Sequence, residues 1–195
     1  MAYTWVGICN MALRRVGAAP IAALTDKPSG LDFSAIYQEA ADEIVSENRE
    51  LGWSDARKRA ELAVDSTAPE STWLYRYLLP SAPFCLTLVE IIDVEDWEIE
   101  GRYVLTDAET PIDIVYDQRI SDPTNITPQL ATAIAARISE KIVYRLIQDK
   151  TLREAILRDA ERDILKAKGL DAIKRKGKSQ AEKGGYSWVE RLTSG

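Results

Sequence analysis

The chain has 195 residues and a net charge of −6, with 46% hydrophobic and 29% charged residues. This length suits one domain that buries a core of its own. No apolar run reaches the roughly 18–20 residues that a membrane span needs, which predicts that no membrane is involved. The N-terminus lacks the early basic stretch of a signal peptide, so we expect the chain to be made in a cytoplasm.

The composition argues against most enzyme chemistry. The chain contains no histidine and two cysteines, Cys9 and Cys85, which both lie in apolar patterns that predict core positions. Catalysis by a histidine base is excluded, and the sequence has no zinc-binding pattern, nucleotide-binding loop or Gly-x-Ser-x-Gly motif. We therefore predict no enzyme activity, no cofactor and no metal. Clustered carboxylates, as in residues 93–100, leave a metal-dependent enzyme open as an alternative.

Four helices are predicted from apolar residues that recur at three- and four-residue steps. We expect them at residues 4–16, 31–51, 128–148 and 151–168. Gly17 should cap the first, and Ser29 with Asp32 should form a capping box for the second. Thr127 followed by Pro128 should begin the third. The short link between the last two predicts antiparallel packing.

Between the second and third helices the apolar period drops to about two, which is typical of strands. We expect strands near residues 85–93, 96–100, 103–107 and 112–119, preceded by a short helix over 53–63. Glu100, Gly101 and Arg102 should form a tight turn, because glycine tolerates positive φ. The predicted fold class is therefore mainly α with a small antiparallel β-sheet insert, an α-helical bundle with a β-hairpin projection.

Charge divides the chain into two parts. The last helix is expected to stop near Gly169, which gives a body of residues 1–169 and a C-terminal arm of residues 170–195. Residues 166–183 contain seven Lys or Arg and two Asp or Glu, a net charge of +5, so the rest of the chain carries −11. We expect the basic arm to stay flexible until it binds phosphates or an acidic partner.

Five stretches of the chain form a pattern when they are taken in order. They are "ICNMALRRVGAAPIAALTD", "GWSDARKRAEL", "YRYLLPSAPFCLTLVEI", "IEGRYVLTDAETPIDIVYDQRISD" and "PQLATAIAARISEKIVYRL". Their order and spacing, over about residues 5–168, resemble the phage tail tubular protein A and head-to-tail adaptor family.

This resemblance implies a structural protein and not an enzyme. Family members form a ring, typically dodecameric, that sits beneath the portal and joins the capsid to the tail. The implied partners are the portal protein ring, other tail (nozzle) proteins, further copies of the chain, and genomic DNA that passes through the bore without specific binding. The implied location is the virion, after synthesis in the host cytoplasm.

Two sets of contact residues follow as hypotheses. The C-terminal arm would bind the portal through charge and apolar anchors. Its predicted contact residues are Lys174, Arg175, Lys176, Lys178, Tyr186, Trp188 and Leu192. The hairpin would meet a neighbouring copy or the next tail protein, because exposed strands add readily to another sheet. Its predicted contact residues are Trp97, Glu100, Gly101, Arg102 and Tyr103.

Two other readings remain open beside the adaptor. A connector or stopper protein of a long-tailed phage would share a similar helical core. A helical DNA-binding protein would act through the basic arm, and its binding would depend steeply on salt.

Overall fold

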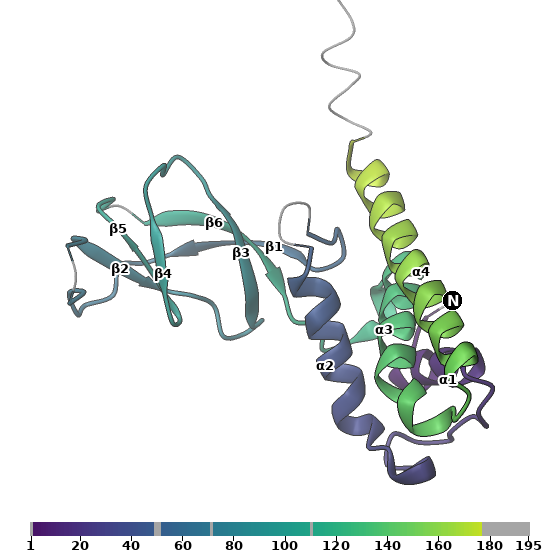
Figure 1. Ribbon diagram of the computed structural model, residues 1–195. Coiled ribbons are helices and arrows are strands. Elements are labelled where there is room, and N and C mark those ends of the chain that lie inside the picture. The colour runs from purple at the N-terminus through teal and green to yellow at the C-terminus, as the bar shows by residue number, and fades with distance from the viewer. Residues whose placement is uncertain (1, 49–51, 71, 110, 177–195) are drawn as a thin grey trace, which may run out of the picture.

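The computed structural model describes residues 2–48, 52–70, 72–109 and 111–176. A bundle of helices forms one part of the molecule, and a β projection extends from its side (Figure 1). Each part has its own apolar core. This arrangement confirms the predicted fold class, mainly α with a small antiparallel β insert.

The bundle is built around its third helix. Its members are α1 (Trp5–Arg15), α2 (Phe33–Ser46), α3 (Pro128–Leu146) and α4 (Lys150–Lys176). Helix α3 packs against the other three, and α4 returns along it after a short link. Its fully buried residues include Ala131, Ala133, Ala135 and Ala136, whose small side chains let the neighbouring helices approach closely.

The helix ends follow local signals in most places. The Thr127 hydroxyl accepts a hydrogen bond from the Leu130 N–H (3.4 Å) and Pro128 begins α3, as predicted. Gly17 takes a positive φ just after α1. The capping box predicted for α2 is wrong. Asp32 is itself the N-cap and accepts a hydrogen bond from the Ser34 N–H (3.1 Å), whereas Ser29 lies in a preceding 3-10 turn.

Helix α4 does not stop near Gly169, as the sequence suggested, but continues to Lys176. Gly169 lies on the exposed side of the helix, where nothing forces a break. The buried stripe of α4 runs on through Ala167 to Asp171. The body of the molecule is therefore longer than predicted, and the helix carries Lys174, Arg175 and Lys176 in its last turns.

The β projection contains two sheets of three strands. They are built from β1 (Arg57–Leu62), β2 (Tyr75–Leu78), β3 (Cys85–Ile91), β4 (Glu98–Glu100), β5 (Tyr103–Thr106) and β6 (Ile112–Gln118). One sheet has the order β1-β6-β3 and the other β2-β5-β4, with antiparallel pairing throughout. Side chains of both sheets, such as Tyr77 and Ile114, share the second core.

The short helix predicted over residues 53–63 is wrong, since Arg57–Leu62 form the strand β1. Apolar residues 53, 56 and 60 repeat at helical spacing, but they serve different parts of the molecule. Trp53 and Ala56 belong to the core of the bundle, whereas Ala60 packs against the core of the projection. Pairing of β1 with β6, 50 to 60 positions away, overrides the local pattern.

The tight turn of the hairpin is confirmed. Glu100 of β4 pairs with Tyr103 of β5, so Gly101 and Arg102 alone connect the two strands. Gly101 has φ +58°, a value that glycine adopts without strain. The strands β3, β5 and β6 also lie close to their predicted positions.

Candidate functional site

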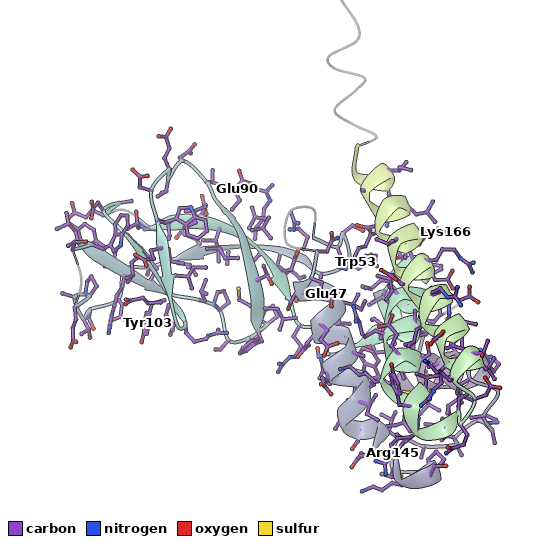
Figure 2. The ribbon with its side chains drawn as sticks, viewed as in Figure 1. Glu47, Trp53, Glu90, Tyr103, Arg145 and Lys166 are labelled. Atoms are coloured by element: carbon purple, nitrogen blue, oxygen red, sulfur yellow. The ribbon has the colours of Figure 1, made fainter. Side chains whose placement is uncertain are left out.

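The predicted hairpin residues lie together on the β projection, on both sides of the β4–β5 turn. Glu100 and Gly101 are exposed, whereas Trp97, Arg102 and Tyr103 are half-buried. Trp97 packs against the core of the projection. Figure 2 labels Tyr103 on this part of the molecule, far from the helices. Only part of the predicted set therefore presents its side chains to solvent.

Arg102 is occupied inside the projection. Its guanidinium donates hydrogen bonds to the backbone carbonyls of Leu79 (3.0 Å), Pro80 (2.5 Å) and Cys85 (3.2 Å). It also stacks on the Phe84 ring, 4.1 Å from the ring centroid. Arg102 belongs to the β4–β5 turn, and these contacts attach it to the segment between β2 and β3. Arg102 therefore positions the hairpin turn.

Tyr103 belongs to a second small cluster. The Arg76 guanidinium lies 4.5 Å from the centroid of its ring. The same guanidinium forms an ion pair with Asp65 (3.2 Å), and hydrogen bonds that include one from the Thr67 N–H lower the pKa of the Asp65 carboxyl. The hairpin is thus held on one side by Arg102 and on the other by Arg76.

A groove of about 560 Å³ lies beside the hairpin. Residues of β3 and β4 line it, together with the segment that Arg102 holds. Its apolar lining includes Leu86, Leu88, Trp97 and Ile99, of which Ile99 is 43% exposed. Since β3 and β4 are each the last strand of their sheet, the groove separates two sheet edges.

A short segment, residues 52–57, joins the bundle to the projection, and we call it the junction segment. The indole of Trp53 is fully buried and donates a hydrogen bond to the Ile44 carbonyl of α2 (2.9 Å). Figure 2 shows Trp53 where the two parts of the molecule meet. The Asp55 carboxylate accepts hydrogen bonds from the N–H and hydroxyl of Thr127 (2.7 Å each), at the start of α3.

The junction segment also contacts α4 and the sheets. The N–H and hydroxyl of Ser54 donate hydrogen bonds to Asp171 (3.1 and 2.5 Å). Arg57 forms an ion pair with the fully buried Asp117 of β6 (2.9 Å). Bonds to α2, α3, α4 and β6 thus fix the direction of the projection relative to the bundle.

The outer face of α4 is the second candidate surface. Leu165 and Ile173 are 63% and 70% exposed and lie eight residues apart, with Gly169 between them, opposite the buried stripe. Lys166 also lies on the outside of this helix (Figure 2). Of the predicted portal-binding residues, Lys174, Arg175 and Lys176 end α4, whereas Lys178, Tyr186, Trp188 and Leu192 lie outside the described residues.

An ion-pair network covers the face where α2, α3 and α4 meet. Arg137 pairs with Glu47 (2.6 Å) and Glu140 (2.9 Å), and Lys141 pairs with Glu43 (2.6 Å). Burial nevertheless raises the pKa of the Glu140 carboxyl, which Arg137 only partly offsets. Glu47, Arg137 and Glu140 of this network line a hollow beside α4.

The two cysteine thiols of the chain lie among the described residues. Burial raises the pKa of the Cys9 thiol to about 12 and that of the Cys85 thiol to about 11. Both cysteines are buried, as predicted. Within residues 2–176, apart from the gaps, no three His, Cys, Asp or Glu side chains gather as metal ligands would. None of the helices in the same residues has the length and apolar character that a membrane crossing requires.

Sequence reasoning missed the anchoring residues Asp117 and Asp171. Both are buried carboxylates, which proteins rarely tolerate without partners. In the sequence they look like ordinary polar positions, and their partners Arg57 and Ser54 are 60 and 117 residues away. The junction segment itself falls in a stretch that the sequence did single out, "GWSDARKRAEL".

No protein-family model matches the chain, and no curated protein matches it either.

Proposed function

We propose that this chain is a structural head-to-tail adaptor of the tail tubular protein A type. Copies of it form a ring, dodecameric as in that family, beneath the portal ring of a phage. The ring connects the capsid to the tail and leaves a bore through which genomic DNA passes without specific binding. The protein acts in the virion, after synthesis in the host cytoplasm, and it catalyses no reaction.

The observation that carries this proposal is the presence of two separate surfaces on one stiff subunit. The outer face of α4 exposes Leu165 and Ile173 next to basic residues. The projection exposes the hairpin and the apolar groove between β3 and β4. Because the junction segment bonds to both parts, a partner at one end is held at a fixed angle to a partner at the other. That is the mechanical requirement of an adaptor.

The end of α4 supplies the portal side of the proposed assembly. Lys174, Arg175 and Lys176 lie in the last turn, next to the exposed Ile173. Cations at a helix C-terminus are also favoured, because the helix dipole places a partial negative charge there. Lys178 and the apolar Tyr186, Trp188 and Leu192 would extend the same contact.

The hairpin supplies the tail side. Glu100 and Gly101 form its exposed tip, and Arg102 and Tyr103 hold that tip in place. Trp97 and Ile99 add apolar surface beside it. A neighbouring copy or the next tail protein would bind here through side chains and strand edges. Contacts between unlike surfaces of adjacent copies close into a ring when the rotation for each subunit is right.

The test uses the full chain and the portal ring encoded by the same genome. Ile173→Asp should weaken binding to the portal about tenfold or more, because it places a charge in an apolar contact. The matched control is Leu152→Asp, at the opposite end of α4, where the wild-type side chain is 49% exposed. Portal binding that both variants retain at full strength would contradict the proposed interface.

A further inference from the structure

The two sheets of the projection are linked into one continuous row of six strands. The two end strands of this row lie on opposite sides of the groove. Val64, just after β1, forms a bridge with Tyr77 of β2, and the Asp65 N–H donates a hydrogen bond to the Arg76 carbonyl (2.9 Å). The row therefore runs β3-β6-β1-β2-β5-β4. The groove lies between its two ends, β3 and β4. One more strand would close this row into a barrel.

The lining of the groove suits a strand with apolar residues at every second position. On β4 and its flanks, alternate residues line it, namely Trp97, Ile99 and Gly101. On the opposite side the consecutive residues Cys85, Leu86, Thr87 and Leu88 of β3 line it. Strand edges provide backbone donors and acceptors, and apolar positions at a period of two provide specificity for alternating side chains.

The rim of the groove is acidic. Exposed carboxylates occur immediately before β4 and along it. They are Glu95, Asp96, Glu98 and Glu100. A strand that is led in by Lys or Arg residues would gain from this charge, and the gain would fall as salt screens it.

The C-terminal segment of the chain has the matching pattern. Tyr186, Trp188 and Leu192 lie an even number of residues apart, so an extended backbone would put them on one side, together with Glu190. The residues just before them, 174–183, contain Lys174, Arg175, Lys176, Lys178 and Lys183. Apolar side chains can thus meet the lining while Lys183, three residues before Tyr186, meets the rim.

The segment is also long enough to reach the groove. Asp171 of α4 bonds to Ser54, the Ala56 carbonyl accepts a hydrogen bond from the Gln118 N–H (2.8 Å), and Gln118 pairs with Cys85 of β3. Together these steps place the near end of the groove within about 30 Å of the end of α4. The nine residues 177–185 span about 30 Å when extended.

We propose that residues 186–192 of the same chain occupy the groove between β3 and β4 as an additional strand when no portal is present. The apolar residues that would anchor the arm on the portal then have a first site on their own subunit. Portal binding and groove binding compete for them, so the arm is kept covered until the portal arrives. The competition with the portal rests on the proposed function, whereas the occupation of the groove concerns the protein alone and is tested without a portal.

The test is disulfide cross-linking in the full, dilute chain with Ser187→Cys and Thr87→Cys, since Thr87 lines the groove on β3. Both pairs are tested in a Cys85→Ser background, because the native Cys85 thiol also lines the groove and would compete for the cysteine at position 187. The control pairs Ser187→Cys with Lys58→Cys on β1, an exposed position outside the groove, two strands from Leu88 of β3. We expect the groove pair to form an internal cross-link about tenfold faster than the control pair.

Equal rates for the two pairs would overturn the proposal. So would a cross-link found only between two copies, which would assign the groove to the arm of a neighbour. Ile99→Cys, on the β4 side of the groove, repeats the test if Thr87→Cys impairs folding. Adding Trp188→Ala should reduce the rate of the groove pair to that of the control pair, and an unchanged rate would rule out the apolar anchor.

Discussion

Asp171 on α4 binds Ser54 of the junction segment through both its carboxylate oxygens, with the Ser54 N–H at 3.1 Å and its hydroxyl at 2.5 Å. The carboxylate is 2% exposed. This contact joins the end of the longest helix to the base of the projection. The contact stabilises α4 beyond Gly169, because Asp171 lies two residues after that glycine.

Asp171→Ala should therefore destabilise the fold. The change leaves the Ser54 donors without their acceptor in a partly buried position, which costs about 2–3 kcal/mol of unfolding free energy. Asp159→Ala, at an exposed position of the same helix, should cost less than about 0.5 kcal/mol. Urea unfolding of the two variants measures the difference, and equal losses would show that the Asp171 contact is not an anchor.

Gly52 and Gly101 provide a matched pair of glycines with positive φ, +61° and +58°. A Cβ at Gly52 would overlap the Arg57 guanidinium and the Asp117 carboxylate, whereas a Cβ at Gly101 would meet no atom within 4 Å. Gly101→Ala should lower the unfolding free energy by about 1 kcal/mol, because alanine is strained at a positive φ but meets no other atom. Gly52→Ala should cost about 3 kcal/mol or more, because it also disturbs a buried ion pair.

Chemical denaturation of the two alanine variants tests this expectation. Similar losses in both would mean that the junction segment moves aside without cost. That result would argue against a stiff connection between the bundle and the projection.

Arg102→Ala should loosen the hairpin without unfolding the bundle. It removes hydrogen bonds to three backbone carbonyls and the stacking on Phe84, and the expected loss is about 2 kcal/mol. Arg102→Lys should restore less than about half of it, since an ammonium does not reproduce the guanidinium fork. Hydrogen exchange should accelerate at the β4–β5 amides and in the segment of residues 79–85 that Arg102 holds, but not in the bundle. Unchanged protection there would remove Arg102 as the positioning residue.

The effect of Glu140 on the stability of the fold should depend on pH. Burial is the largest cause that raises the pKa of its carboxyl, and Arg137 opposes this effect only in part. A carboxyl with a raised pKa binds its proton more tightly in the folded chain, so its ionised form costs stability at pH 7. Glu140→Gln should melt at a higher temperature than the wild type at pH 7.

This advantage should fade as the pH falls to about 4, because the wild-type carboxyl is then protonated as well. Melting curves of both proteins between these pH values test it. A lower melting temperature for Glu140→Gln at pH 7 would show that the ion pair with Arg137 (2.9 Å) outweighs the burial of the charge.

The features that could be predicted from the sequence are local ones. Thr127 with Pro128 marks the start of α3, and Gly101 marks the hairpin turn, because each acts through the backbone of its neighbours. Periodic apolar residues locate the four helices for the same reason. The fold class follows from these signals.

The features that were missed depend on distant partners. Strand β1 exists because β6 pairs with it, and its apolar residues at helical spacing point to two different cores. The last turns of α4 depend on Ser54, 117 positions earlier in the chain. The groove forms between β3 and β4, which belong to different sheets, so it exists only when both sheets have folded. No local pattern in the sequence contains this information.

The adaptor proposal is tested most directly by the mass of the complex in solution. The full chain is measured alone and after mixing with the portal ring encoded beside it. We predict one defined complex whose mass exceeds that of the portal by a whole number of chains, one for each portal subunit. A portal mass that stays unchanged, together with salt-dependent binding of the chain to duplex DNA, would contradict the adaptor and favour a DNA-binding protein.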